Sequence, residues 1–551
     1  MIDAVTLAVL NGRLEQIADE MDATLYRSAF NPIIAEAHDA SHGLYDALSG
    51  ETLVQGKSGL PIFVGAMSFA VKAVIDRHPD GFRDGDMFIF NDPYEGGTHL
   101  NDFKLVRPFF RAGKLFCHLA SVGHWHDVGG NVPGNYNPVA TECWQEAMLI
   151  PPVKLYDGGV YRPDILAILQ ANSRLPNSVL GDLNGQVSAL ELGARRLNDL
   201  LDEYGDAVVL EALGDLRARA VKLMRANIAT LPDGKYSFED FLDNDGIVDE
   251  PLLIAVDIEK KGETMRLDFS RTSPACAGPV NIARSTAVAS IYVALKHIFP
   301  DVPANAGVLE PIEIVIPETS LISVSKPKPV GGYTETILRI IDVMFGALAQ
   351  AAPERVNGMA YGTINALSLA GYRTDEKRLG QRWVMFSFFG GGHGGHPHGD
   401  GLNHGNAPIS TATIPPLEIL EAAYPVRFTQ WALRPDSGGA GKYRGGLGAV
   451  YEIELLEQSA DAFIFGERGK FAPKGVLGGG EAALNVFTYE NDGTWHVPPA
   501  ISKMVGIKLK QGERVRLETP GGGGYGRAEE RDPMAVANDL RLGYITKAGK
   551  A

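Results

Sequence analysis

Glycine and proline constrain this chain more than any other feature of its sequence. The 551 residues include 64 Gly and 33 Pro, together close to 18% of the chain, against roughly 12% in average usage. The excess has no triplet period, which excludes collagen, and it lies between apolar runs, which argues against general disorder. The composition therefore predicts a large, loop-rich globular protein whose turns need special backbone angles.

The charge balance excludes several function classes. The chain has 51 Lys and Arg against 67 Asp and Glu, a formal net charge of −16, which disfavours nucleic acid and anionic membrane surfaces as partners. Its longest apolar run, 287–295, is far short of the roughly 18 residues that span a bilayer. The N-terminus lacks a basic and apolar targeting segment. We therefore expect a cytoplasmic protein.

The three cysteines give no sign of a cross-linked or zinc-bound framework. Cys117, Cys143 and Cys276 are an odd set without C-x-x-C spacing. Neither a disulfide framework nor a cysteine zinc site is therefore indicated.

Apolar periodicity changes along the chain. Steps of three and four predict an amphipathic helix over the first 30 residues, and a helical hairpin over 190–223 that is broken at Gly205-Asp206. Strand patterns over 252–258 and 264–270 predict a β-hairpin, and a further helix fits 333–351. Residues 38–165 read as strands joined by long loops, and the last 160 residues are Gly-rich and strand-like.

Histidine and aspartate residues form a candidate metal site. His99 and Asp102 stand three apart, and His124 follows an apolar, strand-like run that could return the chain to the same place. Two imidazoles and one carboxylate make a facial set with open positions, which suits Zn, Mn or Fe(II) and is typical of catalytic sites. The alternative is that these histidines are hydrogen-bonded loop residues among glycine turns.

Two residues beside this set could move protons. His126 and Asp127 could orient a ligand or transfer a proton, although Asp127 could equally close the turn before 128–130. A second cluster lies in a Gly-rich tract, which either contributes to a metal site or is an ordered loop with structural glycine turns; its members are His393, His396, His398 and His404.

The chain lacks the common nucleotide and nucleophile motifs. Gly56-Lys57-Ser58 matches the tail of a Walker A loop, but Glu51 stands where its first glycine is required. No G-x-S-x-G nucleophile elbow occurs. We therefore expect neither ATP binding through a P-loop nor a serine or cysteine nucleophile.

The motifs N-D-P-Y-E-G-G-T-H-L-N-D at 91–102 and G-H-W-H-D-V-G-G at 123–130 resemble the hydantoinase B/oxoprolinase family. This family includes the B-type subunits of N-methylhydantoinase and caprolactamase and related subunits of acetone and acetophenone carboxylases. The resemblance runs nearly end to end, through 36–46, 146–155, 434–448 and 519–526.

The resemblance implies metal ligands at His99, Asp102 and His124, with Asp39 as a fourth. In one place the chain departs from the family, where many members read H-H-x-D and this chain reads His124-Trp125-His126-Asp127. The role of the second histidine therefore does not carry over, and Trp125 could instead supply an apolar wall.

The family pattern also implies a partner and a reaction. Members of this size work in a hetero-oligomer, such as a heterotetramer, with an A-type subunit that binds ATP and Mg in an actin-like fold. The partner phosphorylates a hydantoin, lactam or 5-oxoproline-like ring, and the B-type subunit hydrolyses the activated intermediate. The alternatives are a subunit of an ATP-dependent ketone carboxylase and a non-catalytic scaffold with a structural metal.

The expected fold class is α+β: a large, mixed, multilayer protein with an N-terminal helix, a metal-binding strand and loop region, a helical hairpin and a Gly-rich β part. The expected regions are 1–165, which binds metal; 166–250, the helical hairpin; 251–390, mixed α/β; and 391–551, Gly-rich and mostly β. A single intertwined unit is the alternative. The glycines are expected to form turns that let the backbone approach a metal.

Overall fold

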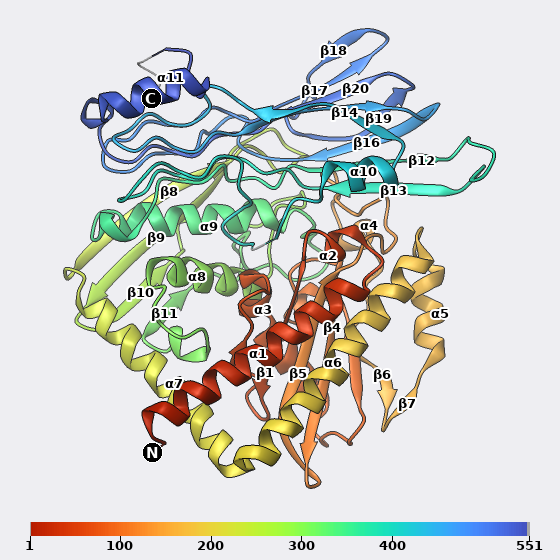
Figure 1. Ribbon diagram of the computed structural model, residues 1–551, viewed down its shortest axis with the longest axis vertical. Helices are drawn as coiled ribbons and strands as arrows, with labels where there is room; N and C mark the ends of the chain where they lie inside the picture. The colour runs from red at the N-terminus through yellow and green to blue at the C-terminus, as the bar shows by residue number, and fades with distance from the viewer. Residues whose placement is uncertain (1, 411, 548–551) are drawn as a thin grey trace.

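The computed structural model describes residues 2–410 and 412–547. An antiparallel seven-stranded sheet in the order β2-β1-β5-β4-β3-β6-β7 forms the middle of the N-terminal part (Figure 1). Its strands are β1 (Ala40–Asp46), β2 (Thr52–Gln55), β3 (Met87–Phe90), β4 (Asp102–Arg111), β5 (Lys114–His124), β6 (Val153–Asp157) and β7 (Val160–Tyr161).

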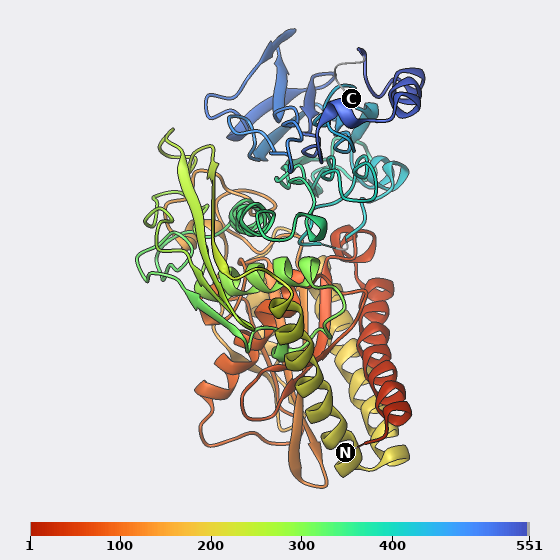
Figure 2. The same cartoon turned by 90° about the vertical axis from the view of Figure 1, so that its left-hand side faces the viewer.

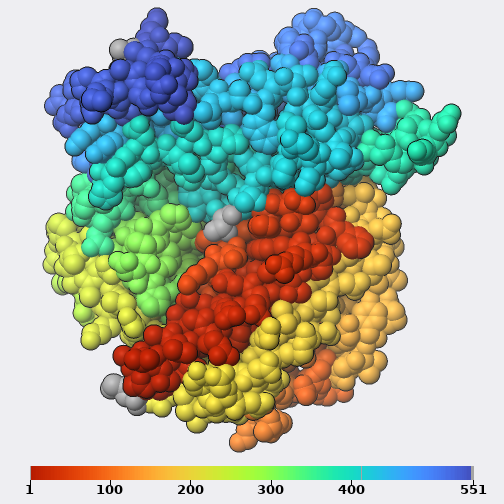
Figure 3. Space-filling model, in the orientation of Figure 1, coloured from red at the N-terminus to blue at the C-terminus, as the bar shows by residue number. Residues whose placement is uncertain are grey.

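Helices cover both faces of this sheet. α1 (Ala4–Ser28) and α6 (Pro176–Tyr204) lie side by side across one face (Figure 3), and α3 (Pro61–Arg77) packs on the other. Because side chains alternate along a strand, Phe103 joins the hydrophobic cluster under α1 and α6, whereas Val106 joins the cluster on the α3 side. The short helices α2 (Pro32–Ala35), α4 (Cys143–Glu146) and α5 (Pro163–Ala171) lie in the connections.

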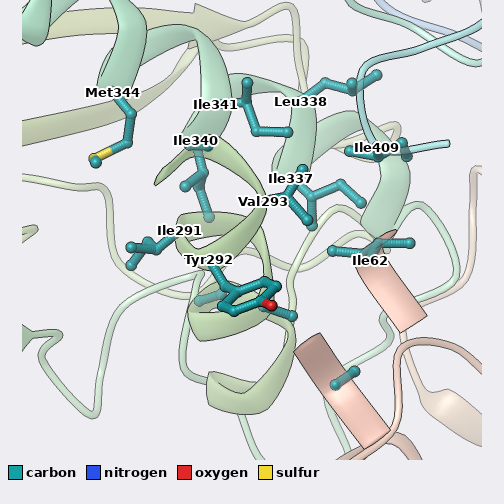
Figure 4. Close-up of a cluster of buried hydrophobic side chains, with 14 of the residues drawn as sticks. Ile62, Ile291, Tyr292, Val293, Ile337, Leu338, Ile340, Ile341, Met344 and Ile409 are labelled. Atoms are coloured by element: carbon teal, nitrogen blue, oxygen red, sulfur yellow. The ribbon is translucent and has the colours of Figure 1, made fainter. Parts of the chain in front are cut away.

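A second sheet, in the order β11-β10-β9-β8, follows α7 (Asp206–Ala229). α9 (Tyr333–Leu348) packs on β8 and β9, and α8 (Arg284–Ile298) packs between α9 and α3. Figure 4 shows the α8–α9 contact, where Ile291 and Val293 lie near Ile337 and Ile340. The strands are β8 (Gly234–Leu242), β9 (Leu252–Lys261), β10 (Thr264–Asp268) and β11 (Ile312–Val315).

The C-terminal part stacks two more sheets at one end of the molecule (Figure 2). Between them lies a separate hydrophobic cluster that includes Leu369, Ile453 and Ile464. One sheet contains β13 (Arg382–Ser387), β12 (Ala366–Tyr372), β16 (Ser459–Phe465) and β19 (Lys503–Lys510); the other contains β14 (Val426–Leu433), β15 (Ala449–Leu455), β20 (Arg514–Glu518), β17 (Val486–Asn491) and β18 (Thr494–His496). Two helices, α10 (Leu417–Ala423) and α11 (Pro533–Leu542), accompany these sheets.

Four Gly-rich segments pack backbone against backbone next to these sheets. In this glycine layer (390–405, 437–448, 474–480 and 519–526), Gly446 N–H donates to His393 O at 2.7 Å and Gly522 N–H donates to Gly446 O at 2.9 Å. A Cβ atom added at Gly522 would lie 2.0 Å from His393 O. Glycine is therefore required there by close approach of two backbones.

The glycine layer corrects one expectation about turns. The glycines of 521–524 do not have positive φ, whereas Gly96, Gly129 and Gly130, in the motif loops, do. Turn geometry therefore explains the glycines near the candidate site, and close packing explains most of those in the C-terminal blocks.

The expected elements are largely confirmed, and the fold class is α+β as expected. α1, the helical hairpin α6–α7, the β9–β10 hairpin and α9 all occur where the periodicity predicts them. α6 begins earlier than expected, and α3 and α8 were not expected, because both are buried on most sides and lack a polar stripe. Within the described residues, the structure contains no helix long and apolar enough to cross a membrane.

Candidate metal and catalytic site

The register of two strands brings the candidate ligands together. Asp102 opens β4 and lies directly opposite His124, the last residue of β5. His99 lies in the turn just before β4, and its Nδ1 is 2.7 Å from Asp102 Oδ2. His124 Nδ1 is 3.4 Å from Asp102 Oδ1. The potential ligand atoms of the three residues all lie within 4.8 Å of one another.

Asp39 joins this cluster from the neighbouring strand. It immediately precedes β1, which pairs with β5, and its carbonyl oxygen accepts a hydrogen bond from His124 N–H at 3.1 Å. Burial raises the pKa of the Asp39 carboxyl to about 7, with His124 opposing the shift and Asp102 adding to it. Asp39 thus lies beside the cluster, although not within the 4.8 Å group.

Four buried polar atoms of this cluster lack a hydrogen-bond partner among residues 2–410 and 412–547. They are Asp39 Oδ1, His99 Nε2, Asp102 Oδ1 and His124 Nε2. A buried, unsatisfied polar atom costs roughly 1–3 kcal/mol, so a cation bound at this position would offset the cost of all four. Two imidazoles with carboxylates fit a divalent Zn, Mn or Fe ion.

Charge at the cluster favours an ionised Asp102. Burial alone would raise the pKa of this carboxyl, but His99 and His124 outweigh burial and hold it well below its usual range. Thr98 also donates its hydroxyl proton to Asp102 Oδ2. Asp102 is therefore an anionic donor at neutral pH.

Three aromatic rings surround the imidazoles. The Tyr333 ring, from the first residue of α9, stacks on His99 with centroids 4.6 Å apart. The Tyr136 ring lies 5.5 Å from that of His99 and stacks on Phe386 at 4.9 Å, and the Phe386 ring stacks on His124 at 5.4 Å. The cluster therefore has an aromatic enclosure that carries two phenol groups.

Amide and carboxyl side chains fasten the loops of the site. Asn101 Nδ2 donates to Trp125 O at 2.9 Å and to Asn135 Oδ1 at 3.2 Å. Asn135 Nδ2 donates to the backbone oxygen of Glu146 at 2.8 Å. The Glu146 carboxylate in turn accepts N–H groups of Val330 at 3.0 Å and Gly331 at 2.5 Å. One network thus joins the metal-site turns to the start of α9.

His126 and Asp127 differ in what their side chains do. His126 is buried with Nε2 unpartnered, and burial lowers the pKa of its imidazole to about 4. Asp127 accepts hydrogen bonds from Gly129 N–H, Gly134 N–H and Arg174, as expected of a residue that closes the turn. Its part in proton transfer stays a prediction.

Trp125 does not form a wall of the site. Its ring stacks on Phe103 at 3.9 Å, and its indole N–H donates to Gln186 of α6 at 2.9 Å. It belongs to the core between the sheet and α6 because it alternates with His124 along the chain.

The second histidine cluster lies in the glycine layer. His393 Nε2 bonds to Asn406 O, and His404 Nε2 bonds to the Tyr451 hydroxyl. His396 Nδ1 accepts the N–H of His398 at 3.3 Å. These contacts fit the ordered-loop alternative, and the group of possible ligands found among residues 2–410 and 412–547 does not include these histidines.

The sequence reasoning missed the residues that surround and fasten the cluster. Tyr136, Tyr333 and Asn135 lie outside the quoted motifs, whereas Asn101 lies within 91–102 and Glu146 within 146–155, where no role was assigned to them. The available signals in the sequence were Gly331-Gly332, directly before the predicted helix over 333–351, and Asn135, in the loop just after the 123–130 motif.

The fold and the site define a large α+β protein with a buried His–Asp–His cluster at the ends of neighbouring strands. The chain belongs to the hydantoinase B/oxoprolinase family, since the model of that family (Hydantoinase B/oxoprolinase) matches residues 3–528.

Named relatives agree with this assignment. Caprolactamase subunit beta of Pseudomonas jessenii is 32% identical over 100% of this chain and 95% of its own length. The crystal structure of ATP-dependent caprolactamase from Pseudomonas jessenii matches with a TM-score of 0.89 and 31% identity, covering 99% of this chain and 95% of that chain. 5-Oxoprolinase 1 of Arabidopsis thaliana is 29% identical over 95% of this chain, but the match covers 42% of that protein.

A more distant structure shares the fold. The nucleotide-free structure of acetone carboxylase, from work on ATP-dependent acetone carboxylation, matches with a TM-score of 0.90 at 20% identity. It covers 100% of this chain and 79% of that chain.

Proposed function

We propose that this chain is the B-type subunit of an ATP-dependent ring-opening amidohydrolase. It would hydrolyse a hydantoin, lactam or 5-oxoproline-like ring after an A-type partner has phosphorylated it. The observation that carries the proposal is the set of four unpartnered buried atoms on Asp39, His99, Asp102 and His124, in a chain that resembles an ATP-dependent caprolactamase along its whole length.

The partner is inferred from what accompanies this region in relatives. The caprolactamase relative is named as a beta subunit, and in 5-oxoprolinase 1 the matching region is 42% of a longer chain. This chain lacks a P-loop motif. A separate A-type subunit that binds ATP and Mg would supply the phosphoryl group.

His99, Asp102 and His124 would hold one divalent ion, with Asp39 as a fourth ligand. Zn or Mn fits this donor set best, and Fe(II) is a further option. Such an ion supplies Lewis-acid chemistry, which polarises an oxygen and lowers the pKa of a water molecule toward about 7.

The chain's own side chains would then complete the reaction. His126 would accept a proton from water, since it lies two residues from His124 and its buried Nε2 has no hydrogen-bond partner among the described residues. Asp127 would act as a positioning residue, since its contacts with Gly134 and Arg174 fix the segment that carries His126.

A second candidate is a subunit of an ATP-dependent ketone carboxylase. The acetone carboxylase structure supports it through the shared fold. That chain is longer, since this one covers 79% of it, and the 31–32% identity to caprolactamase along nearly the full chain favours hydrolysis.

Co-expression with the adjacent reading frame tests the proposal. The purified complex is assayed for ring opening of hydantoins, lactams and 5-oxoproline, with and without ATP. We expect ATP-dependent ring opening by the complex and none by the isolated chain. If the complex instead carboxylated ketones with bicarbonate and opened no ring, the carboxylase proposal would be right and the hydrolase proposal wrong. If the isolated chain hydrolysed ATP and opened the ring by itself, the inference of an A-type partner subunit would be wrong.

A further inference from the structure

We propose that Tyr333, assisted by Tyr136, is a catalytic residue that donates its phenol proton in a hydrogen bond to an oxygen of the phosphorylated intermediate. The inference rests on the proposed function and deepens it, because it assigns a binding group for the charged oxygens of the intermediate beside the metal ligands.

The position of the two rings carries the inference. Tyr333 stacks on His99 at 4.6 Å, and Tyr136 lies within 5.5 Å of His99 and 6.2 Å of His124, measured between ring centroids. Burial, together with the charge of Asp102, raises the pKa of both phenols well above its ordinary value. Both rings therefore lie directly beside the candidate metal ligands.

The hydroxyl protons of Tyr333 and Tyr136 are both available for a hydrogen bond to a ligand. Each is on a buried residue, 4% exposed for Tyr333 and 5% for Tyr136. Within residues 2–410 and 412–547, the hydrogen bonds of the structure include none from either hydroxyl, whereas the hydroxyl of the half-buried Tyr94 donates to Lys328 O. A buried phenol usually finds a partner, so an incoming oxygen is the natural acceptor.

The surroundings hold both tyrosines in place before substrate arrives. Through its carboxyl group, Glu146 binds the N–H groups of Val330 and Gly331, three and two residues before Tyr333. Its backbone oxygen binds the side chain of Asn135, directly before Tyr136. One buried residue, Glu146, therefore holds the segments that carry both phenols. Such preorganisation is what electrostatic stabilisation of a transition state requires.

The chemistry suits a neutral donor. A phenol has an ordinary pKa near 10 and stays protonated at neutral pH. Water adds to the activated carbon and gives a tetrahedral intermediate, whose C–N bond breaks as the ring nitrogen takes up a proton. The ring-opened acyl phosphate then loses phosphate to a second water, and negative charge grows on an oxygen of that carbon in each addition. A donor fixed at that oxygen binds the transition state more strongly than the ground state, which raises kcat.

The test uses the complete complex and variants that each lose a single hydroxyl oxygen. Tyr333→Phe and Tyr136→Phe each remove one hydroxyl and keep the ring contacts, and Tyr292→Phe is the matched control. Tyr292 is also a buried tyrosine with an unpartnered hydroxyl, on α8. Metal content is measured by elemental analysis, and kcat and KM by ATP-dependent ring opening.

We expect Tyr333→Phe to lower kcat by about 100-fold, the usual effect of removing one oxyanion donor. Tyr136→Phe should lower kcat less, and Tyr292→Phe should match the wild type. Bound metal should stay at the wild-type level in all three variants. Wild-type kcat in Tyr333→Phe, or loss of its metal, would overturn the proposal.

A second measurement separates this proposal from the proposed function. Inorganic phosphate, as a probe for the leaving group, is titrated calorimetrically into the metal-loaded complex. We expect Tyr333→Phe to bind phosphate about 10-fold more weakly, the effect of one lost hydrogen bond to a charged group. If the wild type lacks ring-opening activity, the proposed function fails and this titration still decides on Tyr333, with equal affinities overturning its role.

Discussion

Asp102 and His124 face each other across β4 and β5, so one strand register places two candidate ligands 3.4 Å apart. Slipping this register by one residue would turn one of the two side chains to the opposite face of the sheet. The candidate centre therefore depends on strand pairing as much as on the residues themselves.

Removing either imidazole should remove the metal and leave the fold. We expect His99→Ala and His124→Ala to lose bound metal and activity, because each deletes one of three clustered ligands. The exposed His398 provides a control in His398→Ala. Elemental analysis and circular dichroism test this, and full metal content in both site variants would refute the ligand assignment.

Asp39 should contribute less to metal binding than the central three. We expect Asp39→Asn to weaken metal affinity by about 10- to 100-fold, because the amide keeps the shape of the side chain but loses its charge. Competition with a chelator measures the affinity. An unchanged affinity would show that Asp39 does not contribute.

Buried His118 should make the protein sensitive to acid. Burial lowers the pKa of its imidazole to about 4 from the ordinary 6.5. Below pH 6.5 the unfolded chain binds a proton that the folded chain does not, so the stability from neutral His118 is complete above pH 6.5 and falls as pH drops toward 4.

The lowered pKa of His118 sets the size of this loss of stability in acid. A fall of the imidazole pKa from 6.5 to about 4 corresponds to about 3 kcal/mol. Between pH 7 and pH 4, the free energy of unfolding should fall by that much more in the wild type than in His118→Gln. Denaturant unfolding at both pH values measures it, with His398→Gln as the control. Parallel losses in His118→Gln and the wild type would contradict the prediction.

A buried ion cluster ties the glycine-rich part to α9 and β8. Arg468 lies 2.8 Å from Asp240 and 2.5 Å from Asp342, and all three side chains are at most 5% exposed. Arg468→Met leaves two buried carboxylates without this partner, so we expect a loss of about 3–5 kcal/mol in stability.

The control is the pair of Arg427 with Glu454, whose side chains are 58% and 18% exposed. Arg427→Met should cost at most about 1 kcal/mol. Denaturant unfolding of the full chain measures both variants. Equal costs would show that burial does not set the contribution of the cluster.

Two glycine-to-alanine substitutions should change the stability of the protein in opposite directions. Gly522→Ala would put a methyl group 2.0 Å from His393 O, and we expect it to destabilise the protein by about 3 kcal/mol, as overpacking does. Gly214, within α7, has no atom within 4 Å of such a methyl group. Gly214→Ala should therefore stabilise by about 0.5–1 kcal/mol. Thermal unfolding of both variants measures the two changes in stability and tests this prediction.

Local pattern was enough to predict part of this molecule. The amphipathic α1 and the β9–β10 hairpin follow from apolar spacing, and the return of β5 beside β4 explains why His99, Asp102 and His124 meet. α3 and α8 were missed because they are apolar on most sides, which hides helical periodicity.

The aromatic enclosure could not be predicted in this way. Tyr333 reaches His99 only because α9 packs on α8 and α8 on α3, which is a contact between elements far apart in the chain. Glu146 likewise acts through Val330 and Gly331, which no local spacing connects to it.

The glycine layer has a consequence for mutational scanning. Because a Cβ atom at any glycine of 521–524 would lie within 2.2 Å of a backbone oxygen, saturation mutagenesis should reveal a band of intolerant positions over 521–524 as severe as that at the candidate metal ligands. Those positions carry no reacting group. In this chain, intolerance to substitution should therefore mark steric exclusion as often as chemistry, and only assays that separate abundance from turnover will distinguish the two.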